Sequence, residues 1–356
     1  MHNIIFTLDY EIHGNGDGCP MELMVKPTWE LIKQLEKYDA KLTIMADVAE
    51  IMKFVEYKKK NGEDKFYSNK INEQLKYAVA NGHDVQLHIH SSYLKSQYHS
   101  GWNQNWKEYN LAALSYERIN EIIYQCKTYL VELLKPVKND YRCNVFRAAN
   151  WSMHPSKNII RALINNNIEI DTSVYKYGKG SGKVFYDYTD SYSSILPWFA
   201  DIDNICYKNN MGELLEVPIY SVEKSILSFI TPARIARIIT SKFHKHKLSN
   251  DDKKNITIFS ESRKSRFLDK LLKKYPWKLD FSQAMGSQLV KSMKNLPTIE
   301  NIPSIDIPIV LIGHSKTYNW FNKRSLNFFL KYIYQNKNLY SFSLFKDINN
   351  ESFRNI

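Results

Sequence analysis

The chain has 356 residues, 44% of them hydrophobic, so it is long and apolar enough for a globular protein with a substantial core. No apolar run approaches the roughly 20 residues of a membrane-spanning helix, and four scattered cysteines without a CxxC pair argue against a disulfide framework or a thiolate zinc site. The net charge of +12 favours an anionic partner, and nucleic acid, phosphorylated intermediates and acidic lipid head groups are all open.

Short strand-like runs alternate with amphipathic helical stretches along the chain. The order reads as strand 3–9, helix 29–38, strand 41–46, helix 72–80 ending at Asn81-Gly82, strand 84–90, helix 116–134, strand 143–149, helix 156–164, strands 168–174, 213–219 and 307–313, helix 325–334 and strand 339–345. Strands that are separated by helices and buried on both faces indicate a parallel α/β sheet. Seven or eight such units predict a closed or nearly closed (β/α) barrel, in a single domain over 1–356.

One stretch breaks the alternation. Residues 223–278 carry 15 Lys or Arg against 5 Asp or Glu, and Thr231-Pro232 is a helix-start signal. We interpret a basic helical insertion at about 223–305. Within it Ile235, Ile238, Ile239 and Phe243 share one helical face, which is typical of a surface helix docked on the barrel or, alternatively, of a helix at an anionic membrane surface.

Ionisable residues stand at the carboxyl ends of five predicted strands, where parallel α/β folds form their active sites. They are Asp9 and Glu11, His88 and His90, Arg147, Asp171, and His314. At a single strand end, a lone acid is more often a helix cap and a lone histidine more often a core residue. Five strands that end this way indicate an active site.

The HIH run gives the most specific signal for a metal. His88 and His90 lie on the same face of an extended strand, so both can reach one cation. Glu11 would complete three protein ligands and leave a position for water, as in a catalytic site. We therefore expect one divalent metal ion, with zinc (Zn2+) as the default for these ligands; cobalt, nickel and iron are also accepted by such sites.

The ordered set FTLDYE, GHDVQLHIH, FRAANW, IDTSV and LIGHSK resembles the motif series of the polysaccharide deacetylases, the NodB-homology family of carbohydrate esterases. The resemblance covers the chain from residue 3 to about 345, least well over 223–305. It implies a distorted (β/α) barrel and the metal-dependent hydrolysis of an N-acetyl group on a sugar.

The resemblance also implies a role for each matching residue. Asp9 matches the general base, and Glu11 matches the metal-binding acid of the first motif. His88 matches the first histidine of the second motif, and Arg147 matches the arginine that orients the base. The acid of the fourth motif is matched by Asp171, and the histidine that acts as general acid is matched by His314.

The sequence departs from the family pattern at three places. Tyr10 separates two acids that are adjacent in the common first motif. Ser92 stands where the second histidine of the second motif is usual, so His90 is the substitute ligand. Ala148 and Ala149 replace prolines that are common after the motif arginine, which bears on the shape of the substrate groove.

These residues suit amide hydrolysis independently of the family. A divalent metal polarises the carbonyl and lowers the pKa of water. Asp9, kept ionised by Arg147, would take the proton of the water, and His314 would protonate the departing amine. Trp151, four residues after Arg147, would form an apolar wall for the acetyl methyl group or be a buried core residue.

We therefore expect a metal-dependent N-deacetylase. Its substrate would be an N-acetylated saccharide, a precursor of a cell-surface polysaccharide that is lipid-linked or nucleotide-linked. MHNIIFTLDY shows no basic leader with a cleavage site, so we expect no signal peptide and a cytoplasmic protein, at the inner face of the membrane if the 223–278 segment binds lipid. The alternatives are a hydrolase of a non-sugar amide or cyclic amide and a non-catalytic glycan-binding barrel. No nucleic acid is expected as a partner, because no recognised binding motif appears.

Overall fold

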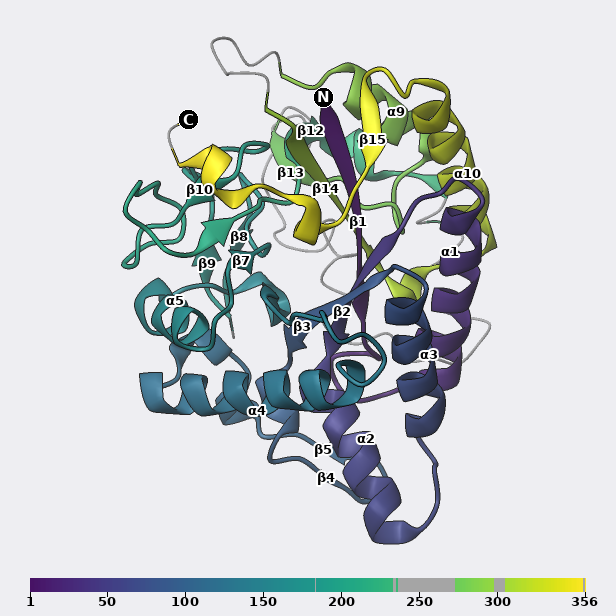
Figure 1. Ribbon diagram of the computed structural model, residues 1–356, viewed down its shortest axis with the longest axis vertical. Helices are drawn as coiled ribbons and strands as arrows, with labels where there is room; N and C mark the ends of the chain where they lie inside the picture. The colour runs from purple at the N-terminus through teal and green to yellow at the C-terminus, as the bar shows by residue number, and fades with distance from the viewer. Residues whose placement is uncertain (183, 233–234, 236–272, 298–304, 355) are drawn as a thin grey trace, which may run out of the picture.

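The computed structural model describes residues 1–182, 184–232, 235, 273–297, 305–354 and 356. One nine-stranded sheet forms its centre, in the order β10-β11-β7-β6-β3-β2-β1-β14, with β15 also paired to β1. Within this sheet only the β10–β11 pair is antiparallel, so the eight strands other than β10 run parallel. The predicted barrel of seven or eight parallel strands is therefore confirmed, as a curled and distorted sheet (Figure 1).

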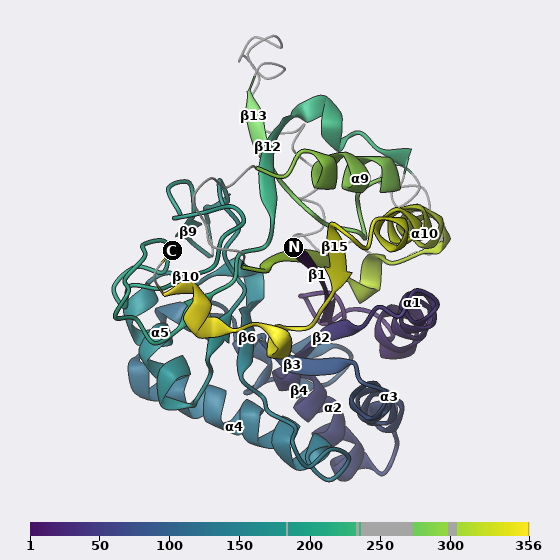
Figure 2. The same ribbon diagram turned by 45° about the horizontal axis from the view of Figure 1, so that its top comes forward.

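Seven α-helices are described, and those that follow the strands cover the outside of the curled sheet (Figure 2). The sheet contains β1 (His2–Tyr10), β2 (Leu42–Asp47), β3 (Asp84–Ile89), β6 (Val145–Ala148), β7 (Ile170–Asp171), β10 (Trp198–Phe199), β11 (Leu215–Glu216), β14 (Ile307–His314) and β15 (Tyr340–Phe342). The helices are α1 (Lys26–Glu36), α2 (Val48–Asn61), α3 (Ser68–Ala80), α4 (Tyr116–Leu134), α5 (Ser156–Asn165), α9 (Gly286–Lys294) and α10 (Trp320–Gln335). The remaining strands form the pairs β4 (Gln97–Tyr98) with β5 (Trp102–Asn103), β8 (Lys179–Gly180) with β9 (Tyr186–Asp187), and β12 (Ser221–Ser225) with β13 (Lys274–Lys278).

The strand β1 has neighbouring strands on both sides, and this explains the apolar run at the start of the chain. It pairs with β14 from His2 to Asp9, and on its other side it pairs first with β15 and then with β2. Because both of its faces are covered, Ile4 to Glu11 are all buried. Phe6 packs against three further rings, those of Phe281, Phe329 and Phe342.

Two of the predicted strands contract to two residues each. The prediction of 168–174 contracts to β7, and that of 213–219 contracts to β11. Side-chain carboxylates intervene here: Ser173 donates its backbone N–H to Asp171, and Val174 donates its backbone N–H to Glu216. These two amides therefore donate to side chains instead of to a neighbouring strand, and β7 ends before them. The backbone N–H groups of Val217 and Ile219, which follow β11, still donate to the backbone carbonyl oxygens of Asp171 and Val174.

The helix α2 was not predicted, although a signal for it exists. Asp47 accepts a hydrogen bond from the backbone N–H of Glu50 at the start of α2, and Gly62 adopts φ 74° at its end. Among the described helices, none is long and apolar enough to cross a bilayer.

The range 223–305 is only partly helical where it is described. Residues 274–278 form β13, which pairs with β12, and Asp280 bridges Ile312 of β14, so this part packs against the barrel wall instead of forming a helical insertion. The residues 236–272, with the predicted face of Ile238, Ile239 and Phe243, lie outside the described residues.

Candidate active site

The register of the parallel sheet brings the predicted strand-end residues to one edge. Asp9 pairs with His314 across β1 and β14, and His88 pairs with Arg147 across β3 and β6. Glu11 follows β1 directly. Because the carboxyl ends of parallel strands share one side of a barrel, these side chains meet there.

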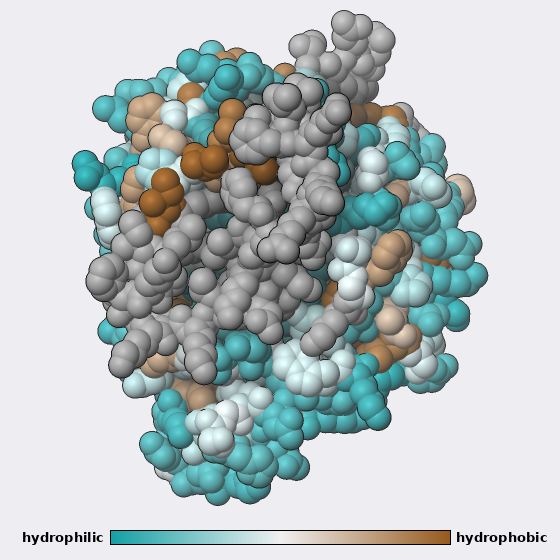
Figure 3. Space-filling view, turned by 180° about the vertical axis from the view of Figure 1, so that it is seen from behind, coloured by the Kyte–Doolittle hydropathy of each residue, from teal (hydrophilic) through white to brown (hydrophobic). Residues whose placement is uncertain are grey.

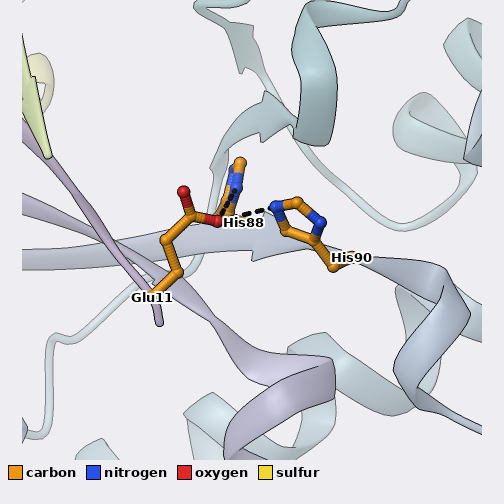
Figure 4. A group of neighbouring side chains, drawn as sticks. All are labelled: Glu11, His88 and His90. Atoms are coloured by element: carbon orange, nitrogen blue, oxygen red, sulfur yellow. Dashed lines mark ion pairs between the residues drawn. The ribbon is translucent and has the colours of Figure 1, made fainter. Parts of the chain in front are cut away.

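Glu11, His88 and His90 form a group whose potential ligand atoms all lie within 4.8 Å of one another. Oε2 of Glu11 is 2.6 Å from Nε2 of His90 and 3.5 Å from Nε2 of His88 (Figure 4). None of the three side chains is more than 7% exposed. Two imidazole nitrogens and one carboxylate oxygen are the donor set of many catalytic zinc sites.

The surroundings of His88 test whether these residues fit a metal. Nδ1 of His88 lies 2.9 Å from the backbone carbonyl oxygen of Arg147 and donates to it, which leaves Nε2 as the atom that faces Glu11. Burial lowers the pKa of His88, but the hydrogen bond to Glu11 and the charges of Asp9, Glu11 and Asp47 raise it to about 9. The negative charge of these buried acids therefore favours a positive charge at Nε2 of His88. The three residues Glu11, His88 and His90 thus fit a divalent cation.

Two neighbours support this group without having been predicted. Nζ of Lys316 lies 3.0 Å from Oε1 of Glu11. Burial would raise the pKa of Glu11, but Lys316 and the two histidines hold it well below its usual value. Asp47 is fully buried, and its Oδ1 accepts a hydrogen bond from the backbone N–H of His90 at 3.1 Å, which fixes the chain at that residue.

The predicted base, its arginine and the predicted acid lie side by side. Oδ1 of Asp9 is 2.8 Å from Nη1 of Arg147, and Oδ2 of Asp9 is 3.5 Å from Nε2 of His314. Burial would raise the pKa of Asp9, but Arg147 first, then His314 and His88, bring it below its usual value. Burial lowers the pKa of His314 by more than the charges of Asp9 and Asp280 raise it. At neutral pH Asp9 is therefore ionised and His314 is neutral.

Asp171 lies apart from this group. It is fully buried beside Glu216, with which it pairs across β7 and β11, and its carboxylate accepts hydrogen bonds from the hydroxyl and backbone N–H of Ser173. Burial is the main cause that raises the pKa of Asp171, and burial and the Asp171 charge raise that of Glu216 well above its usual value. The carboxyl pair adjoins Arg147, whose positive charge acts to lower the pKa of Asp171. Glu216 was not predicted from the sequence.

Trp151 lies next to His314, with 6.1 Å between their ring centroids. Both residues line a cavity of about 560 Å³. The half-buried indole therefore lies at the wall of this cavity, and its contact with a substrate stays a prediction.

Three residues near the site, Asp47, Lys316 and Asp280, were not predicted from the sequence. Asp47 ends β2, so the strand-end rule that found Asp9 would have found it as well. Lys316 stands two residues after His314 in the LIGHSK motif, and only the fold shows that it turns toward Glu11. Asp280 reaches the neighbourhood of His314 through the bridge to β14, for which the sequence carries no signal.

Neither a protein-family model nor a curated protein matches this sequence. Among solved structures, a Parabacteroides distasonis protein provisionally described as a glycoside hydrolase/deacetylase is 12% identical, with a TM-score of 0.54 over 99% of this chain and 71% of that chain. The 4-alpha-glucanotransferase of Thermococcus litoralis is 12% identical, with a TM-score of 0.51 over 97% of this chain and 40% of that chain. A polysaccharide deacetylase of Bacillus cereus is 12% identical with a TM-score of 0.40, over 98% of this chain and 93% of that chain.

The likenesses to the Parabacteroides protein and to the glucanotransferase, both with a TM-score above 0.5, confirm the fold. A glucanotransferase and a protein described as a glycoside hydrolase/deacetylase share this fold, so the fold by itself does not decide the reaction. The activity has to be argued from the side chains at the site.

Proposed function

We propose that this chain is a metal-dependent hydrolase that removes an N-acetyl group from a sugar. The observation that carries the proposal is the adjacency of two groups at one edge of the barrel: the ligand set Glu11, His88 and His90, and the buried pair Asp9 and Arg147 beside His314. The motif resemblance and the fold shared with deacetylases support the same reaction class.

The three ligand residues would hold the cation, for which zinc is the proposed identity. Such an ion supplies polarisation of the amide carbonyl and a more acidic water. Nδ1 of His88, bonded to the Arg147 carbonyl oxygen, would fix the direction of its ligating nitrogen. Lys316 keeps Glu11 ionised and therefore ready to ligate.

Asp9 acts as the base, because Arg147 holds one carboxylate oxygen and leaves the other directed toward His314. The oxygen of water adds to the acyl carbon as its proton passes to Asp9. With Nε2 of His314 only 3.5 Å away, that proton moves on to the neutral imidazole. His314 then gives it to the amine nitrogen as the C–N bond breaks, so that acetate and a free amino sugar leave.

The proposed substrate is an N-acetylated saccharide that serves as a precursor of a surface polysaccharide, carried on a lipid or a nucleotide. Aromatic side chains line the cavity next to His314, among them Trp151, Tyr175 and Trp277. Aromatic faces offer broad apolar contact, which suits the C–H faces of a sugar ring.

A peripheral association with an anionic membrane from the cytoplasmic side is part of the proposal. Leu227, Ile230 and Ile235, which belong to the basic 223–278 stretch, are 62%, 52% and 48% exposed. Elsewhere, hydrophilic side chains cover most of the described surface on the face shown in Figure 3. Replacement of Leu227, Ile230 and Ile235 by glutamate, which leaves the β12–β13 pair in place, should abolish sedimentation with phosphatidylglycerol vesicles. Unchanged sedimentation and unchanged turnover of a lipid-linked sugar would remove this part of the proposal.

The test of the reaction is acetate release from a panel of N-acetylhexosamines, set against cyclic ureides. Activity on the sugars should disappear after treatment with a chelator and return with zinc. Hydrolysis of the ureides alone would favour the cyclic-amide alternative. Glycan binding without acetate release at any metal loading would favour a non-catalytic barrel.

A further inference from the structure

Two buried acids stand at the start of α2 and are not used by the proposed reaction. Asp47 and Glu50 are 0% and 1% exposed, and both lie where β2 passes into α2. A buried carboxyl group is costly unless its oxygens are hydrogen-bonded, so the partners of these two acids indicate what they serve. Those partners lie in the chain just after β1 and just after β3.

One partner of Asp47 is the backbone of His90, a residue of the proposed ligand set. The strand β3 ends at Ile89, so His90 is the first residue beyond it. The backbone N–H of His90 donates to Oδ1 of Asp47 at 3.1 Å, and the same oxygen accepts from the backbone N–H of Glu50 at 3.4 Å. One carboxylate oxygen therefore joins the start of α2 to the backbone of a ligand.

Glu50 makes the same kind of contact beside a second ligand. Its Oε2 accepts a hydrogen bond from the backbone N–H of Ile12 at 3.1 Å, and Ile12 directly follows Glu11. The strand β1 ends at Tyr10, so Glu11 and Ile12 also lie beyond their strand. In a capping box, an acid at the third helical position reaches back to the N-cap backbone. Glu50 stands at that position, but its carboxylate bonds to Ile12.

The strand order explains why one helix start reaches both ligands. β2 lies between β1 and β3, and it pairs with β1 up to Ala46 and with β3 up to Asp47. The chain that leaves β2 therefore enters α2 between the strands that precede Glu11 and His90. His88 differs from these two, because it lies inside β3, where pairing with β2 and β6 holds its backbone.

The two ligands that lie beyond their strands are thus the ones that an acid of α2 supports. Oε2 of Glu11 and Nε2 of His90 are 2.6 Å apart, and this convergence depends on where the two backbones are held. Groups that orient metal ligands from outside the ligand set are typically worth 10- to 100-fold in metal affinity.

We propose that Asp47 and Glu50 are positioning residues of the metal site, which hold the backbone at His90 and Ile12 so that His90 and Glu11 converge on one cation. This inference rests on the proposed function, in which Glu11 and His90 are ligands. The role lies in the accepted hydrogen bonds. A side chain that keeps an oxygen at the same reach should therefore preserve the site, and a shorter side chain should weaken it.

The test is the zinc affinity of the full chain, prepared metal-free and measured by competition with a chromophoric chelator. Glu50→Gln keeps an oxygen that can accept from Ile12 and should bind zinc as the wild type does. Glu50→Asp keeps the acid but is one methylene shorter, so its affinity should fall at least about tenfold. Asp47→Ser still caps α2, but its hydroxyl is too short to reach His90, and the same loss is expected.

Asp84→Ala is the matched control. Asp84 is also a buried acid, and it begins β3 at the end of the strand opposite to His88 and His90. Its removal reports the general effect of losing a buried acid from this strand, and it should leave the zinc affinity unchanged. Denaturant unfolding of each metal-free variant establishes that the chain is folded.

Each outcome decides one part of the proposal. Wild-type affinity in folded Glu50→Asp removes the role of Glu50, and wild-type affinity in folded Asp47→Ser removes that of Asp47. A loss in Glu50→Gln as large as that in Glu50→Asp would contradict a role through the hydrogen bond to Ile12.

Acetate release from N-acetylhexosamines, measured separately, distinguishes this inference from the proposed function. A wild type that binds zinc and releases no acetate refutes the reaction, and the zinc affinities of the variants still decide the positioning role. A wild type that releases acetate, with variants that bind zinc equally well, refutes the positioning role only. A wild type without zinc affinity refutes both.

Discussion

The guanidinium of Arg147 donates to Oδ1 of Asp9 at 2.8 Å, and both side chains are almost fully buried. Arg147 also donates to the hydroxyl of Thr7 and to the carbonyl oxygen of Thr172, so it joins three strands of the barrel at the point where the base lies. The same residue is therefore responsible for the charge state of Asp9 and for local stability.

Arg147→Met should remove both effects. It leaves a buried carboxylate without its partner, a change that costs about 3–5 kcal/mol in the free energy of unfolding. Denaturant unfolding measures this cost, and acetate release should fall to background. Arg142→Met is the control, because the Arg142–Glu169 ion pair is exposed and is worth at most about 1 kcal/mol. Equal costs for the two variants would contradict the assigned role of Arg147.

The metal content should depend on His88. Elemental analysis of the purified protein should find about one divalent ion per chain, as three protein ligands imply. His88→Ala should lose that ion, whereas His99→Ala, which changes an exposed histidine, should keep it. A wild-type protein that takes up no metal from a zinc solution would remove the proposed mechanism.

The pH profile should reveal the state in which His314 begins the reaction. Its pKa is lowered from 6.5, so above pH 6.5 the imidazole is neutral and ready to receive the proton from Asp9. We expect kcat/KM to be level from pH 6.5 to about 8. If His314 had to begin protonated, kcat/KM would instead fall about tenfold per pH unit over that window. His314→Ala should reduce the rate at every pH in the window.

The carboxyl pair of Asp171 and Glu216 should make stability depend on pH in a specific sense. The pKa of Glu216 is raised well above 4.5 in the folded protein, so the unfolded chain releases this proton at lower pH than the folded protein does. Stability is therefore lost as pH rises from 4.5 toward the folded pKa. Glu216→Gln should remove this slope in denaturant midpoints measured from pH 4.5 to 8, and Glu213→Gln, at an exposed position, should leave it intact. If stability changes with pH by the same slope in the wild type, Glu216→Gln and Glu213→Gln, then Glu216 does not retain its proton in the folded protein.

Gly313 should tolerate no larger residue. A Cβ atom there would lie 2.3 Å from the buried ring of Phe281, which itself packs on Phe6. Gly313→Ala should cost about 1–3 kcal/mol through overpacking, and it should also reduce activity, because His314 is the next residue. Gly101→Ala, where the new atom meets nothing within 4 Å, is the neutral control for thermal unfolding. A shift for Gly313→Ala no larger than that of the control would mean that Phe281 moves aside without cost.

The sequence was sufficient for the parallel barrel and for the strand-end residues, because both follow from local patterns. Alternation of apolar strands and amphipathic helices specifies a parallel sheet, and the carboxyl ends of its strands must meet. Asp9, His88, His90, Arg147 and His314 could therefore be assigned to one edge before any coordinate was known. Asp47 followed the same rule and was overlooked, as was the helix that it caps.

Contacts between residues that are far apart in the chain could be determined only from the tertiary structure. The sequence shows Glu216 and Asp171 as separate acids, and their pairing depends on which strands are neighbours in the sheet. Lys278 lies in a stretch read as part of a basic insertion, yet β13 carries it to Trp151, 127 positions earlier in the chain. Periodicity reports which face of an element is buried, and it carries no information about the partner that covers it. Strand order and register supply that information, and with it the charges that surround the site.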